Sequence, residues 1–315
     1  MKKQVEVVIL SGFLGSGKST LLTRMIKNEI EKERKIAVLM NELGKVSIDS
    51  AIIPEDVPLK EMLDGCICCT IQGELSVQLK ELTEEKELDI IYIEATGVAH
   101  PLDVLEACTH PLLVELTQIK AVITVINAKQ WLENKLNNML KKLITHQVKF
   151  ADVILVNKID QITEKELLKV QETIKEENPQ ALQLATTYSD MDLSILDQPL
   201  FLEQKKRDQG EEFRADVKSL HLKTCVISIT QPIERMLLED FLEKNKETLL
   251  RVKGFIRLTE SPAMYLLNYA YGYPMYERVK GEVTVEPVLV FIGQHLDKAQ
   301  LEYQLEQDVF QVNRC

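Results

Sequence analysis

The sequence predicts an α/β protein, with a doubly wound, mainly parallel sheet followed by a smaller α+β domain. Through residues 1–190, short apolar runs alternate with longer amphipathic stretches, as in a parallel sheet covered on both faces. A glycine-rich segment joins the first apolar run to the first amphipathic stretch. After residue 219 several alternating strands and two helices follow, which is the order expected of an α+β domain.

The elements of the first domain follow from the spacing of its apolar residues. Short apolar runs predict strands, and apolar residues at helical spacing predict helices. The predicted strands are Val5–Leu10, Ile36–Met40, Ile90–Ile93, Ala121–Ile126, Asp152–Val156 and Leu182–Ala185. The predicted helices are Thr20–Lys32, Glu74–Glu85, Lys129–Lys142 and Thr163–Glu176.

A polar segment, residues 191–218, is expected to link the first domain to a second domain at 219–315. In the second domain, one strand is expected over Tyr265–Val279, where Tyr269, Tyr271 and Tyr273 would share a face. That face is either a docking surface or a sheet face packed on a helix. The other predicted elements are the strands His221–Thr230, Leu249–Leu258 and Val288–Ile292 and the helices Pro232–Asn245 and Asp297–Gln307.

Composition and charge exclude several classes of function. The net charge of −11 argues against nucleic acid and anionic membranes as partners, because both require a basic surface. No apolar run approaches the roughly 18 residues that span a bilayer, and Val7–Leu10 leads into the glycine-rich segment rather than forming a signal peptide. Three of the six cysteines fall within Cys66–Cys69, which is no disulfide framework, so a reducing cytoplasm is the expected location.

The glycine-rich segment Gly12–Ser19 has the spacing of a phosphate-binding loop, between a predicted strand and a predicted helix. Glycine lets the backbone curl so that successive N–H groups point at phosphates. Lys18 would reach the β- and γ-phosphates, and the Ser19 hydroxyl would bind Mg²⁺. The residues expected at the nucleotide phosphates are Gly12, Gly15, Ser16, Gly17, Lys18, Ser19 and Thr20.

A second segment, Asn157–Asp160, follows a predicted strand directly and indicates which base is bound. The Asp160 carboxylate can accept hydrogen bonds from the ring N–H and the exocyclic amine of guanine, a pair that adenine does not offer. Asn157 would brace the loop and contact the base, while the stem of Lys158 would cover its face. These residues predict GTP and GDP as the ligands.

Two further segments follow strand ends and supply candidates for catalysis. Glu94 could orient the water shell of Mg²⁺ or the attacking water, or it could cap a helix start. Gly97 would let the backbone approach the γ-phosphate. The Asn41–Gly44 segment and Asp49 are placed to act as a switch, although an ordinary turn uses similar residues. Because parallel strands end at one edge of a sheet, these segments and the phosphate loop are expected to form one site, with Lys18, Glu94 and Asp49 as catalytic candidates.

Cys66, Cys68 and Cys69 predict a site for a soft metal. Thiolates suit Zn²⁺, Cu⁺ and, less strongly, Co²⁺ and Ni²⁺. Three ligands leave an open position, which suits a metal that must be passed on, and Glu42 is a candidate further ligand. The alternatives are that the cysteines pack as small apolar side chains or act as a redox centre. The five histidines are scattered, and His110 is a weak ligand candidate.

Taken together, the motifs resemble the CobW-type GTPases, the metal-chaperone or metal-insertase branch of the P-loop GTPases. The resemblance rests on Gly-Phe-Leu-Gly-Ser-Gly-Lys-Ser-Thr, Asn-Glu-x-Gly, Gly-Cys-Ile-Cys-Cys, Glu-x-x-Gly and Asn-Lys-x-Asp, and it extends through Leu250–Gly254 and Val290–Gly293 of the CobW C-terminal domain. It implies a slow, metal-responsive GTPase that binds zinc or a similar ion, such as Co²⁺ or Ni²⁺, at the three cysteines.

The resemblance also implies partners. Hydrolysis of GTP would deliver the ion to an unidentified client metalloprotein, and two copies of the chain could pair across the nucleotide as a homodimer. The switch acids of the family match Glu42 and Asp49, and its acid before the second glycine matches Glu94. The chain lacks the histidine-rich tract of many relatives, which favours zinc over storage of nickel or cobalt. A GTP-dependent docking or regulatory switch and a redox-sensing GTPase are the alternatives.

Overall fold

The computed structural model describes residues 3–40, 59–61, 71–95, 97, 99–198, 222–270, 272–279, 286–294 and 296–310. They fall into two compact units, each described here by itself. The first unit comprises the described parts of Met1–Cys108 and Glu115–Phe201, and the second those of Thr109–Val114 and Leu220–Cys315. Among these residues, no helix combines the length and the apolar character needed to cross a bilayer.

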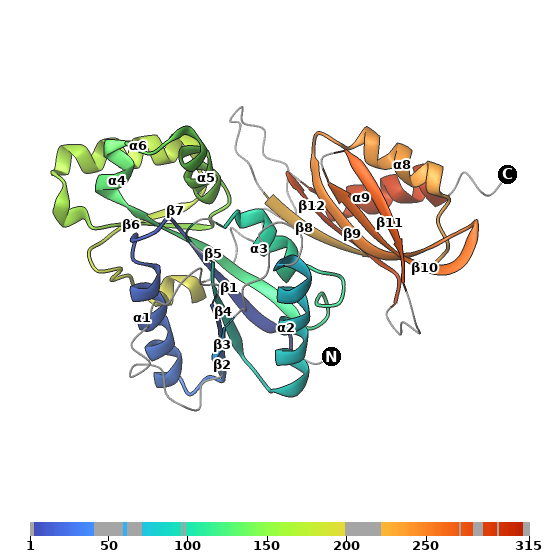
Figure 1. The fold of residues 1–315 in the computed structure, drawn as a ribbon, viewed down its shortest axis with the longest axis horizontal. Helices are drawn as coiled ribbons and strands as arrows, with labels where there is room; N and C mark the ends of the chain where they lie inside the picture. The colour runs from blue at the N-terminus through green and yellow to red at the C-terminus, as the bar shows by residue number, and fades with distance from the viewer. Residues whose placement is uncertain are drawn as a thin grey trace. The chain divides into compact units, whose positions relative to one another are not determined.

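A parallel sheet of seven strands forms the centre of the first unit (Figure 1), in the order β3-β2-β4-β1-β5-β6-β7. The predicted parallel α/β fold is therefore confirmed. Among the strands of this sheet, the pattern of the sequence misses only β3, because three residues are too few to show a period; among the helices it misses α3 Pro101–Cys108. The strands are β1 Val5–Ser11, β2 Ile36–Met40, β3 Leu59–Glu61, β4 Ile90–Glu94, β5 Thr117–Asn127, β6 Val153–Asn157 and β7 Leu182–Ala185.

Helices cover both faces of this sheet, as β6 illustrates. Leu155 packs in one apolar cluster with Met25 of α1, whereas its neighbour Val156 packs in another with Val170 of α6. Successive residues of a strand face opposite sides, so β6 is buried from both. The helices are α1 Lys18–Glu31, α2 Ile71–Glu85, α3 Pro101–Cys108, α4 Ala128–Glu133, α5 Asn138–Lys149 and α6 Glu164–Glu177, with 3₁₀ turns η1 Ile159–Gln161 and η2 Leu193–Asp197.

The expectation of one helix over Lys129–Lys142 is wrong, because two asparagines divide it into α4 and α5. Asn134 ends α4 in the left-handed conformation, with φ of 49°. Asn137 then starts α5, and its side chain accepts a hydrogen bond from the Leu140 N–H. The apolar spacing continues across this break, so periodicity alone did not reveal it.

The segment expected as a polar linker begins with residues that pack on the first unit. Leu196 in η2 is buried in the same apolar cluster as Met25 of α1. Asp197 forms ion pairs with Lys32 at 3.1 Å and with Lys120 at 2.6 Å. Residues 199–221 lie outside the described residues, so the division of the chain at 190 and 219 stays a prediction.

An antiparallel sheet of five strands, in the order β11-β10-β9-β12-β8, forms the second unit. Two helices pack on it: Phe241 of α8 and Leu301 of α9 share an apolar cluster with Val252 and Phe291 of the strands. This arrangement confirms the α+β fold. The strands are β8 Leu222–Ser228, β9 Leu249–Leu258, β10 Ser261–Ala270, β11 Tyr273–Arg278 and β12 Val288–Gln294; the helices are α8 Arg235–Lys244 and α9 Lys298–Leu305, which a π-helical turn, Glu306–Phe310, extends.

The expectation of one strand over Tyr265–Val279 is also wrong, because the chain turns at Gly272, where φ is 85°. β10 and β11 are therefore antiparallel neighbours, with Ala270 opposite Tyr273. Tyr269 is 2% exposed and its hydroxyl donates to the Leu242 carbonyl, whereas Tyr273 is 77% exposed. These two tyrosines lie on opposite faces, and Tyr271 is outside the described residues.

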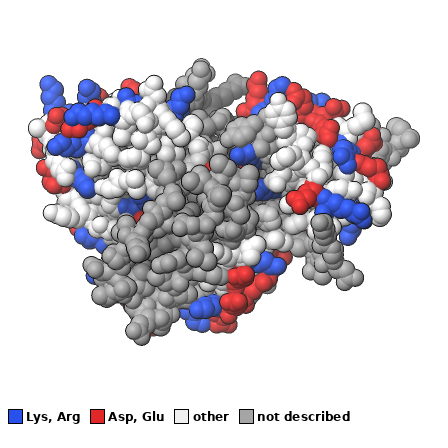
Figure 2. All heavy atoms as spheres, in the orientation of Figure 1, with Lys and Arg blue, Asp and Glu red and all other residues white. Residues whose placement is uncertain are grey.

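On the face shown in Figure 2, lysine and arginine side chains are interspersed with aspartate and glutamate. Separately, a partly buried group of charges lies at the start of β1, where Glu6 pairs with Arg34 at 2.6 Å and with Lys120 at 3.1 Å. Burial raises the pKa of the Glu6 carboxyl, but these two cations outweigh burial and leave the pKa lowered. The same Lys120 also holds Asp197, so this network joins β1, β5 and η2.

Candidate nucleotide site

The phosphate-binding loop connects β1 to α1, and its glycines are required by close contacts. Gly17 has φ of 115°, and a Cβ there would lie 2.4 Å from Nδ2 of Asn157 and 2.7 Å from Oγ of Ser189. Gly12 has φ of 131°, and a Cβ there would lie 2.2 Å from the carbonyl oxygen of Val125. Any side chain at either position would displace the loop from its neighbours.

A cleft of about 440 Å³ opens over this loop. It brings together the phosphate loop and the Asn157–Asp160 segment, as expected for parallel strands ending at one edge. Within the described residues, the buried hydroxyl of Ser16 has no hydrogen-bond partner, so a polar group remains to be satisfied beside the cleft. The lining residues are Gly15, Gly17, Lys18, Ser19, Thr20, Asn157, Lys158, Asp160, Gln161 and Tyr188.

Lys18 is buried inside the loop that it belongs to. Its Nζ donates to the Gly12 carbonyl at 2.8 Å and to the Phe13 carbonyl at 3.5 Å. Burial lowers the pKa of the Lys18 amine, and the nearby Glu94 carboxylate opposes part of that shift. A polyanion entering the cleft would favour the charged amine.

Glu94 ends β4 and lies directly beside the loop. The Ser19 hydroxyl donates to Oε1 of Glu94 at 2.9 Å. In the sheet, Glu94 is in register with Leu10 on one side and with Met40 on the other. The next helix, α3, begins only at Pro101, so Glu94 is not at a helix start. The hydroxyl and the carboxylate together offer two hard oxygen donors of the kind that Mg²⁺ prefers.

Gly97 lies close to the other side of the loop. A Cβ on Gly97 would lie 2.7 Å from the backbone nitrogen of Leu14. The carbonyl of Gly97 accepts a hydrogen bond from Nε2 of Gln147 at 3.2 Å. The segment after β4 is therefore held between the phosphate loop and α5.

The residues that the sequence analysis missed include Gln161, which lines the cleft, and Tyr188 and Ser189, which follow β7. Oδ1 of Asn157 accepts from the Ser189 N–H at 2.9 Å, and the Ser189 hydroxyl donates to the Gly17 carbonyl at 2.9 Å. Tyr188 lines the cleft in a left-handed conformation, with φ of 54°. Tyr188 and Ser189 follow β7, so their position after a strand end was the one available signal; their residue types match no motif.

The other predicted site residues, Glu42, Asp49, Cys66, Cys68 and Cys69, lie outside the described residues. In the part of the chain that the structure describes, no three His, Cys, Asp or Glu side chains come together as metal ligands. Nδ1 of His110, the weak candidate, accepts from the Leu112 N–H at 3.3 Å, so its own turn uses this nitrogen.

Three features define the class of P-loop GTPases. They are a phosphate loop between β1 and α1, a glutamate that accepts a hydrogen bond from the serine of that loop, and an Asn-Lys-x-Asp segment at the same cleft. Two family models agree with this assignment. The CobW/HypB/UreG nucleotide-binding domain matches residues 6–185, and the cobalamin synthesis protein cobW C-terminal domain matches residues 222–308. The chain belongs to the CobW/HypB/UreG family of GTPases.

Individual proteins are similar over most of the chain. Zinc-regulated GTPase metalloprotein activator 1 of Dictyostelium discoideum is 29% identical, covering 85% of this chain and 68% of that protein. Zinc chaperone YjiA of Escherichia coli K12 is 30% identical, covering 94% and 96%. The crystal structure of a Zn(II)-bound triple mutant of the YjiA GTPase has a TM-score of 0.50 at 22% identity, covering 97% of this chain and 99% of that one, and shows that the fold is shared.

Proposed function

We propose that this protein is a zinc chaperone that binds Zn²⁺ at Cys66, Cys68 and Cys69 and releases it to a client metalloprotein under the control of GTP. Family membership supports the proposal, as do the two similar proteins whose names are zinc-regulated GTPase metalloprotein activator 1 and zinc chaperone YjiA. The observation that carries it is the contact between Ser19 and Glu94. Glu94 ends β4, and the segment that contains the cysteines follows β3, whose end is in register with that of β4 through β2.

The nucleotide would occupy the cleft over the phosphate loop. Backbone N–H groups of Gly12–Ser19 and the amine of Lys18 would hold the phosphates, together with Thr20 at the start of α1. Asp160 would select guanine, with Asn157 bracing the loop and Lys158 covering the base. The crowding at Gly17 and the unsatisfied hydroxyl of Ser16 support this fit.

Ser19 and Glu94 would hold Mg²⁺, and their 2.9 Å contact already brings both oxygens to one side of the loop. When bound, Mg²⁺ supplies positive charge that offsets the negative charge of the phosphates. Glu94 or Asp49 would orient the water that attacks the γ-phosphate. The products are GDP and inorganic phosphate.

The cysteine segment begins close to this chemistry. Glu61, the last residue of β3, is in register with Met40, and Met40 is in register with Glu94. Neighbouring strands are about 4.8 Å apart, so the chain leaves β3 roughly 10 Å from the backbone of Glu94. Glu42, two residues after β2, would join the three thiolates as a further ligand. A change at the γ-phosphate could therefore change the affinity for zinc.

Delivery requires a client that accepts the ion, and the reduced thiolates require a reducing compartment such as the cytoplasm. The proposal also includes a homodimer, in which two copies of the chain pair across the nucleotide. The metal is cargo in this cycle, and only its affinity for the cysteine site changes when GTP becomes GDP.

A competition titration tests the proposal. Zn²⁺ is titrated against a chromophoric chelator with the full chain loaded with GDP or with a non-hydrolysable GTP analogue. We expect the two affinities to differ by about tenfold or more, which is about 1.4 kcal/mol of coupling. Equal affinities would contradict nucleotide-gated delivery and favour a docking switch.

Matched cysteine variants locate the site. Replacing Cys66, Cys68 and Cys69 with serine should abolish the high-affinity zinc, whereas Cys315→Ser should leave it unchanged. GDP affinity serves as the control for folding in both variants. If the triple variant retained its zinc, the ligands would have to be sought elsewhere in the chain.

A further inference from the structure

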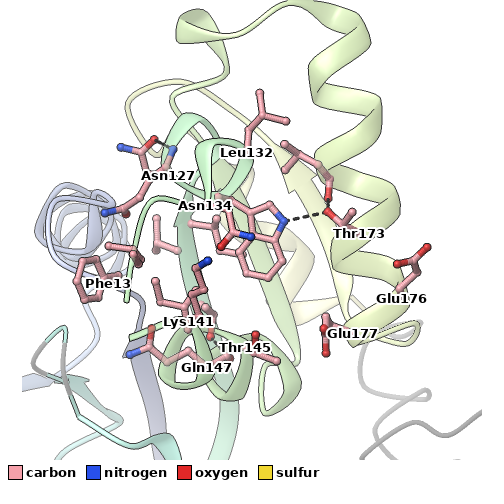
Figure 3. A pocket seen from close by; sticks show the side chains of 18 of the residues that line it. Phe13, Asn127, Leu132, Asn134, Lys141, Thr145, Gln147, Thr173, Glu176 and Glu177 are labelled. Atoms are coloured by element: carbon pink, nitrogen blue, oxygen red, sulfur yellow. Dashed lines mark hydrogen bonds between the residues drawn. The ribbon is translucent and has the colours of Figure 1, made fainter. Parts of the chain in front are cut away.

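A pocket of about 500 Å³ lies among β5, α4, α5 and α6, on the face of the sheet that these helices cover (Figure 3). It shares no lining residue with the nucleotide cleft, although Phe13 of the phosphate loop lines this pocket. Its volume is within the range of small-molecule sites, which is about 300–1,000 Å³. The proposed zinc chaperone function gives this pocket no task.

The apolar part of the pocket is built around Trp131, the only tryptophan of the chain. Its Nε1 donates to the Thr173 hydroxyl at 2.9 Å, which fixes the orientation of the indole (Figure 3). Ile144 and Val170 are buried and line the same space, with Leu132 beside them. A planar ring could stack against the indole or lie along these aliphatic side chains.

Two lysines line the pocket, Lys141 of α5 and Lys169 of α6, and Lys169 is exposed to water. Lys141 of α5 is half-buried, and no ion pair within the described residues involves it. Of the two acids on the α6 side, Glu177 pairs with Lys149 at 3.4 Å, and Glu176 is exposed to water. The unmatched charge in the pocket is therefore positive, which favours an anionic ligand.

The pocket also contains a buried hydrogen-bond acceptor, the side-chain oxygen of Gln147. Gln147 lines the pocket and is 0% exposed. Its Nε2 donates to the Gly97 carbonyl at 3.2 Å and to the Ala99 carbonyl at 3.4 Å, which fixes the orientation of the amide. Its Oε1 has no hydrogen-bond partner among the described residues. A buried acceptor is stabilised by a donor, so a ligand N–H or O–H would suit this position.

We propose that this pocket binds a small aromatic anion that carries an N–H or O–H group. The ring packs against Trp131, the anionic group pairs with Lys141, and the donor meets Oε1 of Gln147. Gln147 also contacts the Gly97 segment of the nucleotide site, so it is unsuitable as a test position. Within the described residues, no hydrogen bond joins the Lys141 side chain to that segment.

The test uses 1-anilinonaphthalene-8-sulfonate, which has a naphthalene and a phenyl group, a sulfonate and an N–H, with the full chain loaded with GDP. Energy transfer from Trp131 to the probe reports binding. We expect saturable binding at one site, with loss of Trp131 emission. Lys141→Met should weaken binding by about tenfold or more, because it removes the charge and keeps the stem. Lys142→Met is the matched control, since Lys142 is exposed and does not line the pocket, and should change nothing.

A second probe and a second variant keep the outcome decisive. N-phenyl-1-naphthylamine has the same rings and N–H but no sulfonate, so it should bind more weakly and equally to the native protein and Lys141→Met. Lys141→Arg should retain the binding of the sulfonate. If the sulfonate probe caused no loss of Trp131 emission, the proposal would be overturned. A second copy of the chain covering the pocket would give this result. Equal binding of the sulfonate to Lys141→Met and the native protein would also overturn it.

Discussion

Asn157 and Ser189 are joined by two hydrogen bonds. Oδ1 of Asn157 accepts from the Ser189 N–H at 2.9 Å, and Nδ2 of Asn157 donates to the Ser189 hydroxyl at 3.0 Å. The same Nδ2 also donates to the Ser16 carbonyl at 2.8 Å. One buried amide thus fastens the ends of β6 and β7 to the phosphate loop.

Replacing this amide should weaken nucleotide binding more than it weakens the fold. In Asn157→Ala, the Ser16 carbonyl and the Ser189 N–H lose a buried partner, which costs about 1–3 kcal/mol. We expect GDP affinity to fall about 10- to 100-fold, measured with a fluorescent GDP analogue. Asn178→Ala is the control: Asn178 is also buried and bonds the carbonyls of Val148 and Ala151, outside the cleft. It should lower the melting temperature and leave GDP affinity unchanged.

Two glycines of the loop should respond differently to alanine. At Gly17 the new methyl group would collide with Asn157 and Ser189, so Gly17→Ala should reduce GDP affinity by more than about tenfold. At Gly15, where φ is 70°, nothing lies within 4 Å of the added Cβ. Gly15→Ala therefore meets only backbone strain of about 1–2 kcal/mol. An equal loss in the two variants would show that contacts with Asn157 and Ser189 do not matter.

Glu94→Gln should separate hydrolysis from binding. Glutamine keeps an oxygen that can accept from the Ser19 hydroxyl but removes the negative charge. If Glu94 orients water or supports Mg²⁺, the rate of phosphate release at saturating GTP should fall about 100-fold or more. GDP affinity without Mg²⁺ should change little. A variant that hydrolysed GTP at the native rate would remove Glu94 from the catalytic candidates.

The stability of the first unit should depend on pH through His146. Nδ1 of His100 accepts from the Leu102 N–H at 3.3 Å, so Nε2 of His100 carries the proton and donates to Nδ1 of His146 at 3.0 Å. Burial and the nearby Lys149 and Lys142 lower the pKa of His146, and Glu177 opposes this. As pH falls, His146 is therefore protonated at a higher pH in the unfolded chain than in the folded one. The folded state loses stability as pH drops through about 6.5.

Denaturant unfolding at about pH 7.5 and about pH 5.5 tests this sign. The free energy of unfolding should fall between the two values, and it should fall less in His146→Gln. Glutamine can still accept from Nε2 of His100 but cannot be protonated in this range. An equal fall in both proteins would assign the pH dependence to other groups.

The sequence predicted the sheet well because buried parallel strands leave continuous apolar runs, as in Val153–Val156. It also located the cleft, since the phosphate loop and Asn157–Asp160 combine specific residue types with fixed spacing. Ser189 was missed because its role comes from its contact with Asn157, and no local pattern records such a contact. The turn at Gly272 was missed because β-forming tyrosines continue on both sides of it.

Ion pairs connect α1 to the segment that follows β7. The helix begins at Lys18, inside the phosphate loop, and its C-cap residue, Lys32, holds Asp197. Its 14 residues make a rod of about 21 Å. Arg24, near the middle of α1, also forms an ion pair with Asp190 at 2.7 Å. These ion pairs join Asp190 and Asp197 to the helix whose first turn lines the nucleotide cleft, so a displacement of α1 would also move the segment that follows β7.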